Sequence, residues 1–367
     1  MQSVSGSSLL ALTVPKTLRE ALSTRDNALN FVRLLLAAVV VIAHAWLAGG
    51  FDGGEETARF SAWAGNGFFA LSGYLIAGSR MRLGIREFVV NRVLRIFPAF
   101  WVVLIVIVIA FVIAPLTSHT AGWDYDPSSA VGYVFNNAGL HITQAGIDGT
   151  LTNAPWPSVW NLSLWTLIYE FGAYIGAAIL LTLPWARKHP LVATGTAYAL
   201  AVFAQACALS PLVGSPWQYL DMLRLAPWFI AGLFLYFLAD RLRPTIRQTA
   251  LAAALLAGLF AIGVADLIGH LPFAFILLRF ASASPVRVGA RNDISYGVYI
   301  YAWPIQQVLA ALGADSFGPV WSGVLALAVT IPLAWASWKL VEEPSMRLRK
   351  RIPRRWYGDK PRMSSRA

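Results

Sequence analysis

Residues 30–44 read Asn30-Phe-Val-Arg33-Leu-Leu-Leu-Ala-Ala-Val-Val-Val-Ile-Ala-His44, a run of aliphatic side chains that contains one arginine and one histidine. With its neighbours, the run is long enough to cross the ~30 Å hydrocarbon core of a bilayer as an α-helix. Eleven residues at ~100° and ~1.5 Å each return to nearly the same helix face about 16 Å further along. Arg33 and His44 are therefore predicted to face one groove at different depths. An ionisable side chain in hydrocarbon costs roughly 2.5 kcal/mol or more unless it faces a protein or water cavity, so the pair is typical of a functional site.

The composition of the whole chain also indicates that the protein lies in a lipid bilayer. Hydrophobic residues make up 57% of the 367 residues and charged residues 13%, whereas about 25% of the residues in a soluble domain are charged. We therefore predict an all-α, polytopic helical bundle in a membrane. A short apolar segment lies at 270–284, and nine segments have full spanning length: 28–48, 59–78, 93–115, 161–183, 191–211, 222–239, 248–268, 294–312 and 319–340.

The charges between these segments predict how the chain alternates across the membrane. Basic residues collect in every second loop and in the tail: Arg80/Arg82/Arg86, Arg187/Lys188, Arg241/Arg243/Arg247, Arg287/Arg291 and Arg347 onward. The loops between them are acidic, and basic loops are cytoplasmic by the positive-inside rule. Counting 270–284 as a span keeps the basic tail inside and the acidic turn at Asp315 outside. We therefore predict about ten transmembrane helices with both termini in the cytoplasm.

This topology divides the chain into three parts. They are a cytoplasmic N-terminal arm (1–27), a transmembrane domain (28–341) with a long outer loop (116–160), and a basic cytoplasmic tail (342–367). The net charge of +11 does not indicate nucleic acid, because the positive residues are spread among juxtamembrane loops. Orientation and contact with anionic membrane lipids account for them.

Six short patterns follow one another along the chain. They are Arg25-Asp26-Asn-Ala-Leu-Asn-Phe-Val-Arg33, Gly67-Phe-Phe-Ala-Leu-Ser-Gly-Tyr-Leu-Ile76, Asn91-Arg92-Val-Leu-Arg95-Ile-Phe-Pro98, Ser163-Leu-Trp-Thr-Leu-Ile-Tyr-Glu170, Ser295-Tyr-Gly-Val-Tyr299 and Val341-Glu-Glu-Pro344. In that order, and with His44 after the first, they resemble the signature of the membrane-bound acyltransferase-3 family. The resemblance covers nearly the whole chain. It implies an integral-membrane enzyme that moves an acetyl or related acyl group from a cytoplasmic acyl-CoA to a carbohydrate hydroxyl.

The resemblance also suggests in which membrane the protein lies and whether it needs a further domain for the transfer. We expect the protein in the bacterial plasma membrane, acting on a surface polysaccharide, a glycolipid or a glycosylated metabolite. Some members of the family carry an additional esterase-like domain, which we do not expect here. The chain would then complete the transfer alone or hand the acyl group to another protein.

His44 and Arg33 have chemical roles that the residues themselves suggest. A neutral imidazole near the outer end of the first span can accept a proton from a sugar hydroxyl as that hydroxyl attacks a thioester. The alternative is a histidine hydrogen-bonded inside the bundle. The guanidinium fork of Arg33 could bind a phosphate or polarise the acyl carbonyl. Its alternative is an arginine that snorkels to the headgroups.

Three further ionisable residues lie near helix starts or inside spans. Arg92 and Arg95 are three residues apart at the start of the third span, where arginines suit the phosphates of coenzyme A. Positive-inside anchoring is the alternative. Glu170, in an otherwise uncharged aromatic span, could hold His44 or an arginine in position, or could form a structural pair in the bundle. We therefore predict His44, Arg33 and Glu170 as catalytic residues, and Arg92, Arg95 and Arg33 as the site for acyl-CoA, most simply acetyl-CoA.

Other patterns suggest packing rather than chemistry. Ser72 is not part of a Gly-x-Ser-x-Gly elbow, so Ser72-Gly73 is predicted to be a small-residue helix contact. The chain has Ala302 where many family members have a histidine before the aromatic residue and proline, so a mechanism with a second imidazole is doubtful. His119 and His141 in the outer loop lack tight ligand spacing, and we predict no metal. The loop's aromatic residues could stack on sugar rings or form an ordinary interfacial belt: Trp123, Tyr125, Tyr133, Trp156 and Trp160.

A transporter or flippase for a lipid-linked sugar is the main alternative to an enzyme. Arg33, His44 and Glu170 would then bind substrate or relay protons, because intramembrane ionisable groups serve transporters equally well. The arginine pair at a helix start and the ordered family pattern favour the enzyme.

Overall fold

A computed structural model gives the arrangement of most of the chain. It describes residues 16–24, 27–113, 126–152, 154–209, 217–289, 292–353 and 356–357. Several residues named above lie outside these ranges: Arg25, Asp26, His119, Trp123, Tyr125 and Arg291, together with the last ten residues of the tail.

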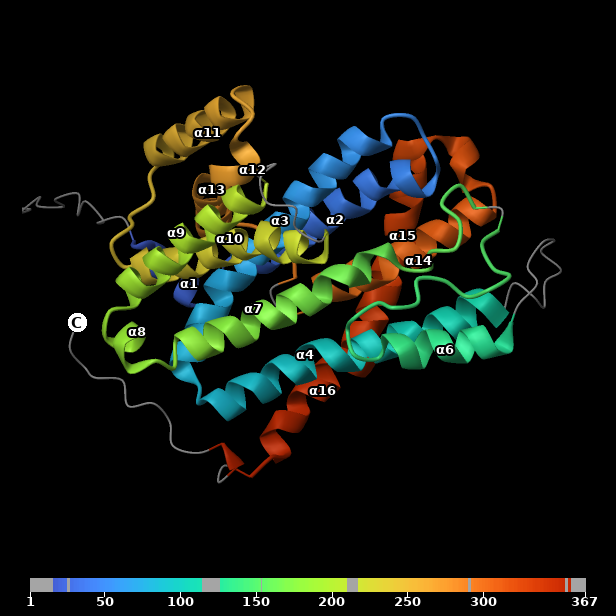
Figure 1. Cartoon of the computed structure of the whole chain (residues 1–367), viewed down its shortest axis with the longest axis horizontal. Coiled ribbons are helices and arrows are strands. Elements are labelled where there is room, and N and C mark those ends of the chain that lie inside the picture. Colours follow the sequence, from blue (N-terminus) through green and yellow to red (C-terminus); the bar gives the residue numbers. More distant parts are fainter. Residues whose placement is uncertain are drawn as a thin grey trace, which may run out of the picture.

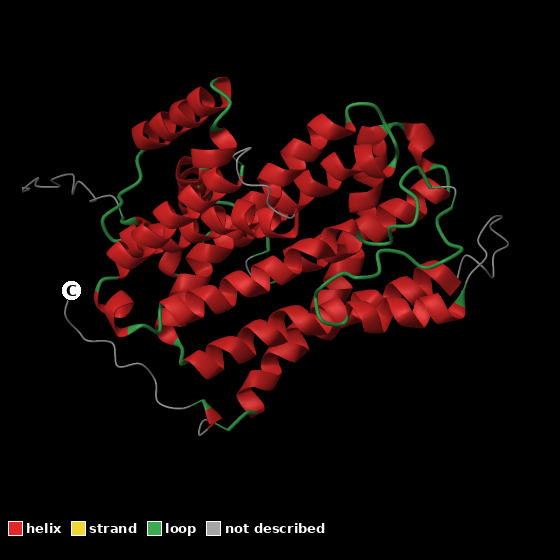
Figure 2. Ribbon diagram, viewed as in Figure 1, coloured by secondary structure: helices red, strands yellow, loops and turns green. Residues whose placement is uncertain are grey.

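The described residues form helices and loops, with no strand among them (Figure 2). The elements are α1 (Leu18–Ser23), α2 (Leu29–Ala48), α3 (Gly54–Arg82), α4 (Ile85–Val106), the π-helical η1 (Ile107–Ile113), α6 (Pro127–Asn137), the 3-10 helix η2 (Leu162–Thr166), α7 (Leu167–Leu180), α8 (Pro184–Lys188), α9 (Pro190–Ala208), α10 (Trp217–Leu238), α11 (Ile246–Ala261), α12 (Ala265–Ile268), α13 (His270–Ala283), α14 (Ser295–Ala311), η3 (Ala314–Phe317), α15 (Pro319–Ser337), η4 (Trp338–Glu342), α16 (Glu343–Leu348) and η5 (Arg349–Arg351). The predicted all-helical class is confirmed for the described residues, whereas the predicted segment 248–268 is divided between α11 and the short α12.

Helix length and apolarity support membrane crossing. Six helical stretches in the described residues are long and apolar enough to span a membrane: Leu29–Ala48, Ile85–Ala110, Leu162–Leu180, Pro190–Ala208, Asp221–Leu238 and Pro319–Arg351. The apolar helices α11 and α13 have only 16 and 14 residues. The chain is thus an integral membrane protein, whereas the number of ten spans stays a prediction.

The helices run mostly along the long axis of the molecule (Figure 1). In that view α1 and the basic α8 lie toward the left end, and α6 from the outer loop lies at the right end. The side of the membrane on which each loop lies stays a prediction. The cytoplasmic position of the termini stays a prediction.

Helix α3 is central to the bundle, because it packs against α2 on one side and α10 on another. A Cβ atom added at Gly73 would overlap the carbonyl oxygen of Phe229, and one added at Gly232 would overlap that of Ala70. Two backbones can approach this closely only where both residues lack a side chain. The predicted small-residue contact at Gly73 is therefore confirmed, and it fixes α3 against α10 beside the site described next.

Candidate active site

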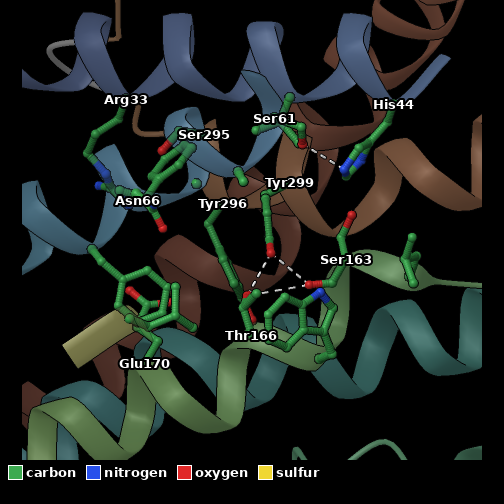
Figure 3. Close-up of a pocket in the computed structure, with 18 of the residues that line it drawn as sticks. Arg33, His44, Ser61, Asn66, Ser163, Thr166, Glu170, Ser295, Tyr296 and Tyr299 are labelled. Carbon is green, nitrogen blue, oxygen red and sulfur yellow. Dashed lines mark hydrogen bonds between the residues drawn. The ribbon is translucent and has the colours of Figure 1, made fainter. Parts of the chain in front are cut away.

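A cavity of about 300 Å³ lies inside the bundle and is lined by α2, α3, η2, α7, α10 and α14, with contributions from α4. Four of the five predicted site residues line it: Arg33, His44, Arg95 and Glu170. Arg33 and His44 lie at opposite ends of the cavity on the same face of α2 (Figure 3). Their spacing therefore places them in one groove at different depths, as the sequence predicts.

His44 is held by two neighbouring helices. Its Nε2 lies 2.8 Å from the Ser61 hydroxyl of α3. The edge of its ring packs against Trp303 of α14, with ring centroids 5.3 Å apart. Trp303 in turn donates from Nε1 to the carbonyl of Val159 in the outer loop, at 3.2 Å. The imidazole is thus fixed in orientation but still lines the cavity, as a proton acceptor must.

The arginine end of the cavity is built around Asp293, just before α14. Both Arg33 and Arg95 donate to Oδ2 of Asp293, the second at 2.9 Å. Arg95 also donates to Oε2 of Glu342, at 2.6 Å. Ser295 donates to the other carboxylate oxygen of Asp293, at 2.6 Å. Two cations therefore balance two anions, and the network joins α2, α4, the start of α14 and η4.

The two guanidinium groups keep Asp293 ionised. Burial raises the pKa of Asp293, but the guanidinium groups of Arg33 and Arg95 outweigh burial and lower that pKa to about 2. Asp293 is therefore negatively charged at any physiological pH. Neither Asp293 nor Glu342 was a predicted site residue. A sequence signal existed for both, since each acid adjoins the end of an apolar segment and Glu342 belongs to the motif ending at Pro344.

Arg92 differs from its neighbour Arg95. It has no hydrogen-bond or ion-pair partner in the part of the chain that the structure describes, and its Nε is buried. Its guanidinium group lies 5.7 Å from the centroid of the Phe88 ring and 5.9 Å from that of Tyr174. Arg92 does not line the cavity. It is nevertheless close enough to Glu170 and Arg95 to interact electrostatically with both.

Glu170 has hydroxyl partners rather than a salt bridge. Its Oε1 accepts hydrogen bonds from Ser72, at 3.1 Å, and from Tyr174. Figure 3 shows Glu170 toward the Arg33 end of the cavity and away from His44. The sequence leaves open whether Glu170 holds His44 or an arginine in position. In the described structure Glu170 makes no direct contact with His44. Ser72, predicted to be only a packing residue, also positions this carboxylate.

Tyr296 and Tyr299 line the cavity, but both hydroxyl groups are used within the protein. The hydroxyl of Tyr299 donates to the carbonyl of Ser163, at 2.7 Å, and lies 2.6 Å from the Thr166 hydroxyl. That of Tyr296 donates to the carbonyl of Ile96, at 2.9 Å. These bonds fix η2 and α14 as cavity walls.

Asn66 is a cavity residue that the sequence analysis did not single out. It lies on α3 toward the Arg33 end of the cavity (Figure 3). Its amide has no hydrogen-bond partner among the described residues, although its side chain is mostly buried. A free amide in such a position can donate to a bound carbonyl or hydroxyl oxygen.

The outer loop has a packed interior of its own. Trp160 is fully buried, and its Nε1 donates to the Thr150 hydroxyl at 2.8 Å. Tyr133 is also buried, whereas Trp156 is partly exposed and packs against Trp303. Of the aromatic residues predicted for this stacking surface and described by the structure, Trp156 alone is exposed, and Phe135, which was not among them, is exposed as well. His141 is exposed on this loop, away from the cavity lining.

Comparison with known proteins shows the family of the chain. A family model described as an acyltransferase domain matches residues 26–339. Nodulation protein 10 of Rhizobium leguminosarum is 29% identical over 359 residues, covering 89% of this chain and 95% of that protein. An O-acetyl transferase of Shigella phage Sf6 is 28% identical over 344 residues, covering 87% of this chain and 96% of the relative.

A third relative is longer than this chain. A peptidoglycan O-acetyltransferase of Listeria monocytogenes is 24% identical over 356 residues, which cover 84% of this chain but 54% of the relative. No solved structure matches the chain significantly.

Proposed function

The chain belongs to this acyltransferase-domain family, and on that premise we propose that it moves an acetyl or related acyl group from cytoplasmic acyl-CoA to a carbohydrate hydroxyl. The chain is a membrane enzyme that transfers acyl groups, and two relatives are named as O-acetyltransferases. The acceptor that we propose is a surface or lipid-linked carbohydrate, and the location is the bacterial plasma membrane. A transporter or flippase has no comparable support.

One observation carries the proposal. A single cavity joins a cationic end at Arg33 and Arg95 to an imidazole at His44, about 16 Å further along α2. A reaction between an anionic donor from one side of a membrane and a hydroxyl from the other side needs such an arrangement. The donor's phosphates would lie near the arginines, and its thioester would extend toward His44.

His44 would act as the general base. As the acceptor oxygen attacks the thioester carbonyl, the imidazole takes the hydroxyl proton, the carbon–sulfur bond breaks, and the thiolate leaves with the electron pair. The imidazolium can then return the proton to the thiolate. The free amide of Asn66, toward the Arg33 end, is suited to donate to a polar atom of the bound donor.

The three arginines would contribute unequally to binding the phosphates of the donor. Arg33 and Arg95 are already paired with Asp293 and Glu342, so their charges are largely compensated. Arg92 has no ion pair in the described residues but does not line the cavity, so we propose that it adds positive charge behind Arg95 at the phosphate end. Arg33 and Arg95 would add hydrogen bonds from nitrogens that the carboxylates leave free. The carboxylate of Glu170 would attract the guanidinium group of Arg92 and so influence its position.

The proposal is tested with protein purified in detergent and acetyl-CoA labelled in the acetyl group. Release of free thiol, with transfer of label to an added saccharide mixture, supports acyl transfer. A protein that binds saccharide but never consumes acetyl-CoA would indicate the transporter alternative.

A further inference from the structure

The cavity has a middle level that lies about one helical turn from His44 in the direction of Arg33. Helices α2 and α3 run antiparallel, because a short turn joins them. Ser61 of α3 contacts His44 of α2. Four residues further along each helix, about 6 Å toward the arginine end, Val40 of α2 and Gly65 of α3 both line the cavity. We call the depth of these two residues the middle level.

Helix α14 crosses the middle level at Tyr299, which Figure 3 shows between the two ends of the cavity. Ser295, four residues before it, donates to Asp293 at the arginine end. Trp303, four residues after it, packs against His44. The hydroxyl of Tyr299 is already bonded to η2. The three helices therefore contribute a valine, a glycine and a tyrosine whose hydroxyl is already used.

Gly65 leaves open space at the middle level. A Cβ atom added there would meet nothing within 4 Å, whereas one added at Gly73 on the same helix would overlap the backbone of α10. Glycine is less favourable than alanine inside a helix, and no close helix approach requires it at Gly65. The glycine therefore enlarges the cavity rather than serving the packing of the helices.

Asn66, next to Gly65 on α3, adds a polar group on the arginine side of the middle level (Figure 3). Its side chain is 7% exposed. Its amide has no hydrogen-bond partner in the part of the chain that the structure describes. An amide can donate to a carbonyl oxygen and accept from an N–H group, and a buried amide without a partner is costly. A molecule that carries amide groups would satisfy it.

A slender, uncharged chain with amide groups matches these walls. The pantetheine arm of coenzyme A, between the diphosphate and the sulfur, is such a chain. It has the reach of about four extended residues, roughly 15 Å, and Arg33 and His44 are about 16 Å apart along α2. We propose that the pantetheine arm of the donor crosses the middle level, where Gly65 leaves room for it and Asn66 bonds to one of its amide groups. This inference rests on the proposed function and assigns two residues that contact its donor.

A sugar ring of the acceptor fits the middle level less well. Each sugar hydroxyl needs a hydrogen-bond partner when it leaves water. Val40 offers none, and the hydroxyl of Tyr299 is already used. Ser61 and Ser163 line the cavity closer to His44 (Figure 3). The acceptor is therefore expected near these hydroxyl groups, and the middle level is left to the donor.

Binding of two nucleotides in detergent tests the proposal: acetyl-CoA, and adenosine 3′,5′-bisphosphate, which lacks the arm. Gly65→Leu should weaken acetyl-CoA binding by about tenfold or more, because excluding two methylenes of the arm from the cavity has that effect. Gly65→Ala should act in the same direction with a smaller loss. Asn66→Ala should weaken acetyl-CoA binding by roughly twofold to tenfold, as expected for one neutral hydrogen bond. All three variants should bind the bisphosphate as the wild-type protein does.

Matched measurements separate contact with the arm from damage to the fold. Gly258→Leu on α11 replaces an exposed glycine that also has open space around it but does not line the cavity, and it should leave both affinities unchanged. Gly65→Ala should lower the affinity for acetyl-CoA without lowering the unfolding midpoint, which a merely structural glycine would not do.

Three results would overturn the proposal. The first is wild-type affinity for acetyl-CoA in Gly65→Leu. The second is an equal loss of affinity for both nucleotides, which would indicate damage to the arginine end. The third is a change confined to the apparent affinity for the acceptor, which would place the acceptor at the middle level.

Nucleotide binding requires no turnover, so the two proposals fail separately. If the wild-type protein transfers the acetyl group but Gly65→Leu binds acetyl-CoA normally, this inference alone is wrong. If Gly65→Leu loses acetyl-CoA binding as expected but the wild-type protein never transfers the acetyl group, the proposed function alone is wrong.

Discussion

Arg33 and Arg95, from different helices, donate to the same carboxylate oxygen, Oδ2 of Asp293. An anion between two guanidinium groups offsets their repulsion, so Asp293 holds Arg33 and, together with Glu342, holds Arg95. The same acid is separated from Arg33 by 260 residues in sequence. The cationic end of the cavity is therefore a product of tertiary packing, and the first prediction concerns its stability.

Asp293→Asn should destabilise the protein by roughly 3–5 kcal/mol, because it leaves two buried cations with one remaining anion. Thermal unfolding in detergent measures the effect. The pKa of Asp293 is lowered to about 2 from an ordinary 3.8, so its contribution is present above about pH 4 and is lost as pH falls toward 2. Asp52→Asn, at an exposed carboxylate, is the control. Adding Arg33→Gln to Asp293→Asn should recover part of the loss, and full stability of the single variant would contradict the charge-balance argument.

Arg92→Ala and Arg95→Ala should each weaken acyl-CoA binding, since each removes a positive charge from the proposed phosphate end of the cavity. A hydrogen bond to a charged group contributes roughly 1.5–3 kcal/mol, which corresponds to about a tenfold to hundredfold loss of donor affinity. Titration calorimetry with acetyl-CoA, together with apparent constants for donor and acceptor, provides the measurement. Donor affinity at the wild-type level in the double variant would reduce both arginines to membrane anchors.

Gly73→Ala should be poorly tolerated, because the added Cβ would overlap the backbone of α10 at Phe229. The helices would have to separate beside the cavity. Gly65→Ala on the same helix is the matched control, since a Cβ there meets nothing within 4 Å and should raise stability by roughly 0.5–1 kcal/mol. Unfolding midpoints in detergent should move in opposite directions for the two variants; equal midpoints would show that α3 and α10 can adjust.

Topology is tested with reporters fused to the chain. A periplasm-active reporter placed after Asp148 should give signal, and the same reporter after Arg351 should give none, because the basic tail is predicted to be cytoplasmic. A cytoplasm-active reporter at each position is the reciprocal control. Signal from the periplasmic reporter at both positions would exclude ten spans.

The sequence predicts those features that depend on helical periodicity. The positions of Arg33 and His44 on one face of α2 follow from a spacing of eleven residues, and the structure places both in the same cavity. The small side chains at Ser72-Gly73 predict a helix contact there, although not that its partner is α10. The resemblance to the acyltransferase-3 family predicts the enzyme class, which helical periodicity does not.

Features that depend on distant partners could not be predicted in the same way. The hydrogen bonds of Glu170 come from Ser72 and Tyr174, of which only Tyr174 is nearby in sequence. The pairing of Arg95 with Asp293 and Glu342 requires α4, α14 and η4 to be packed together. A single sequence shows that these residues are costly in a membrane but does not show which charges meet.

His44→Ala is the most direct test of the chemistry. The variant should remain folded in the membrane, since alanine is less costly in lipid than histidine and the Arg33 network lies at the other end of the cavity. It should still bind acyl-CoA, but acyl transfer should fall by about 10²- to 10⁴-fold, the usual contribution of a positioned general base. Radiolabel transferred from acetyl-CoA to saccharide measures the rate, and donor affinity is measured on the same preparation.

Two kinds of variant show whether the loss reflects proton transfer. His119→Ala and His141→Ala change the outer loop and should retain substantial activity. Ser61→Ala removes the hydroxyl 2.8 Å from Nε2 of His44 and should lower the rate by less than His44→Ala, because the imidazole itself remains packed against Trp303. Near wild-type transfer by His44→Ala would make this histidine a packing residue, and the base would then have to be sought among the remaining polar groups of the cavity, with Glu170 the first to test.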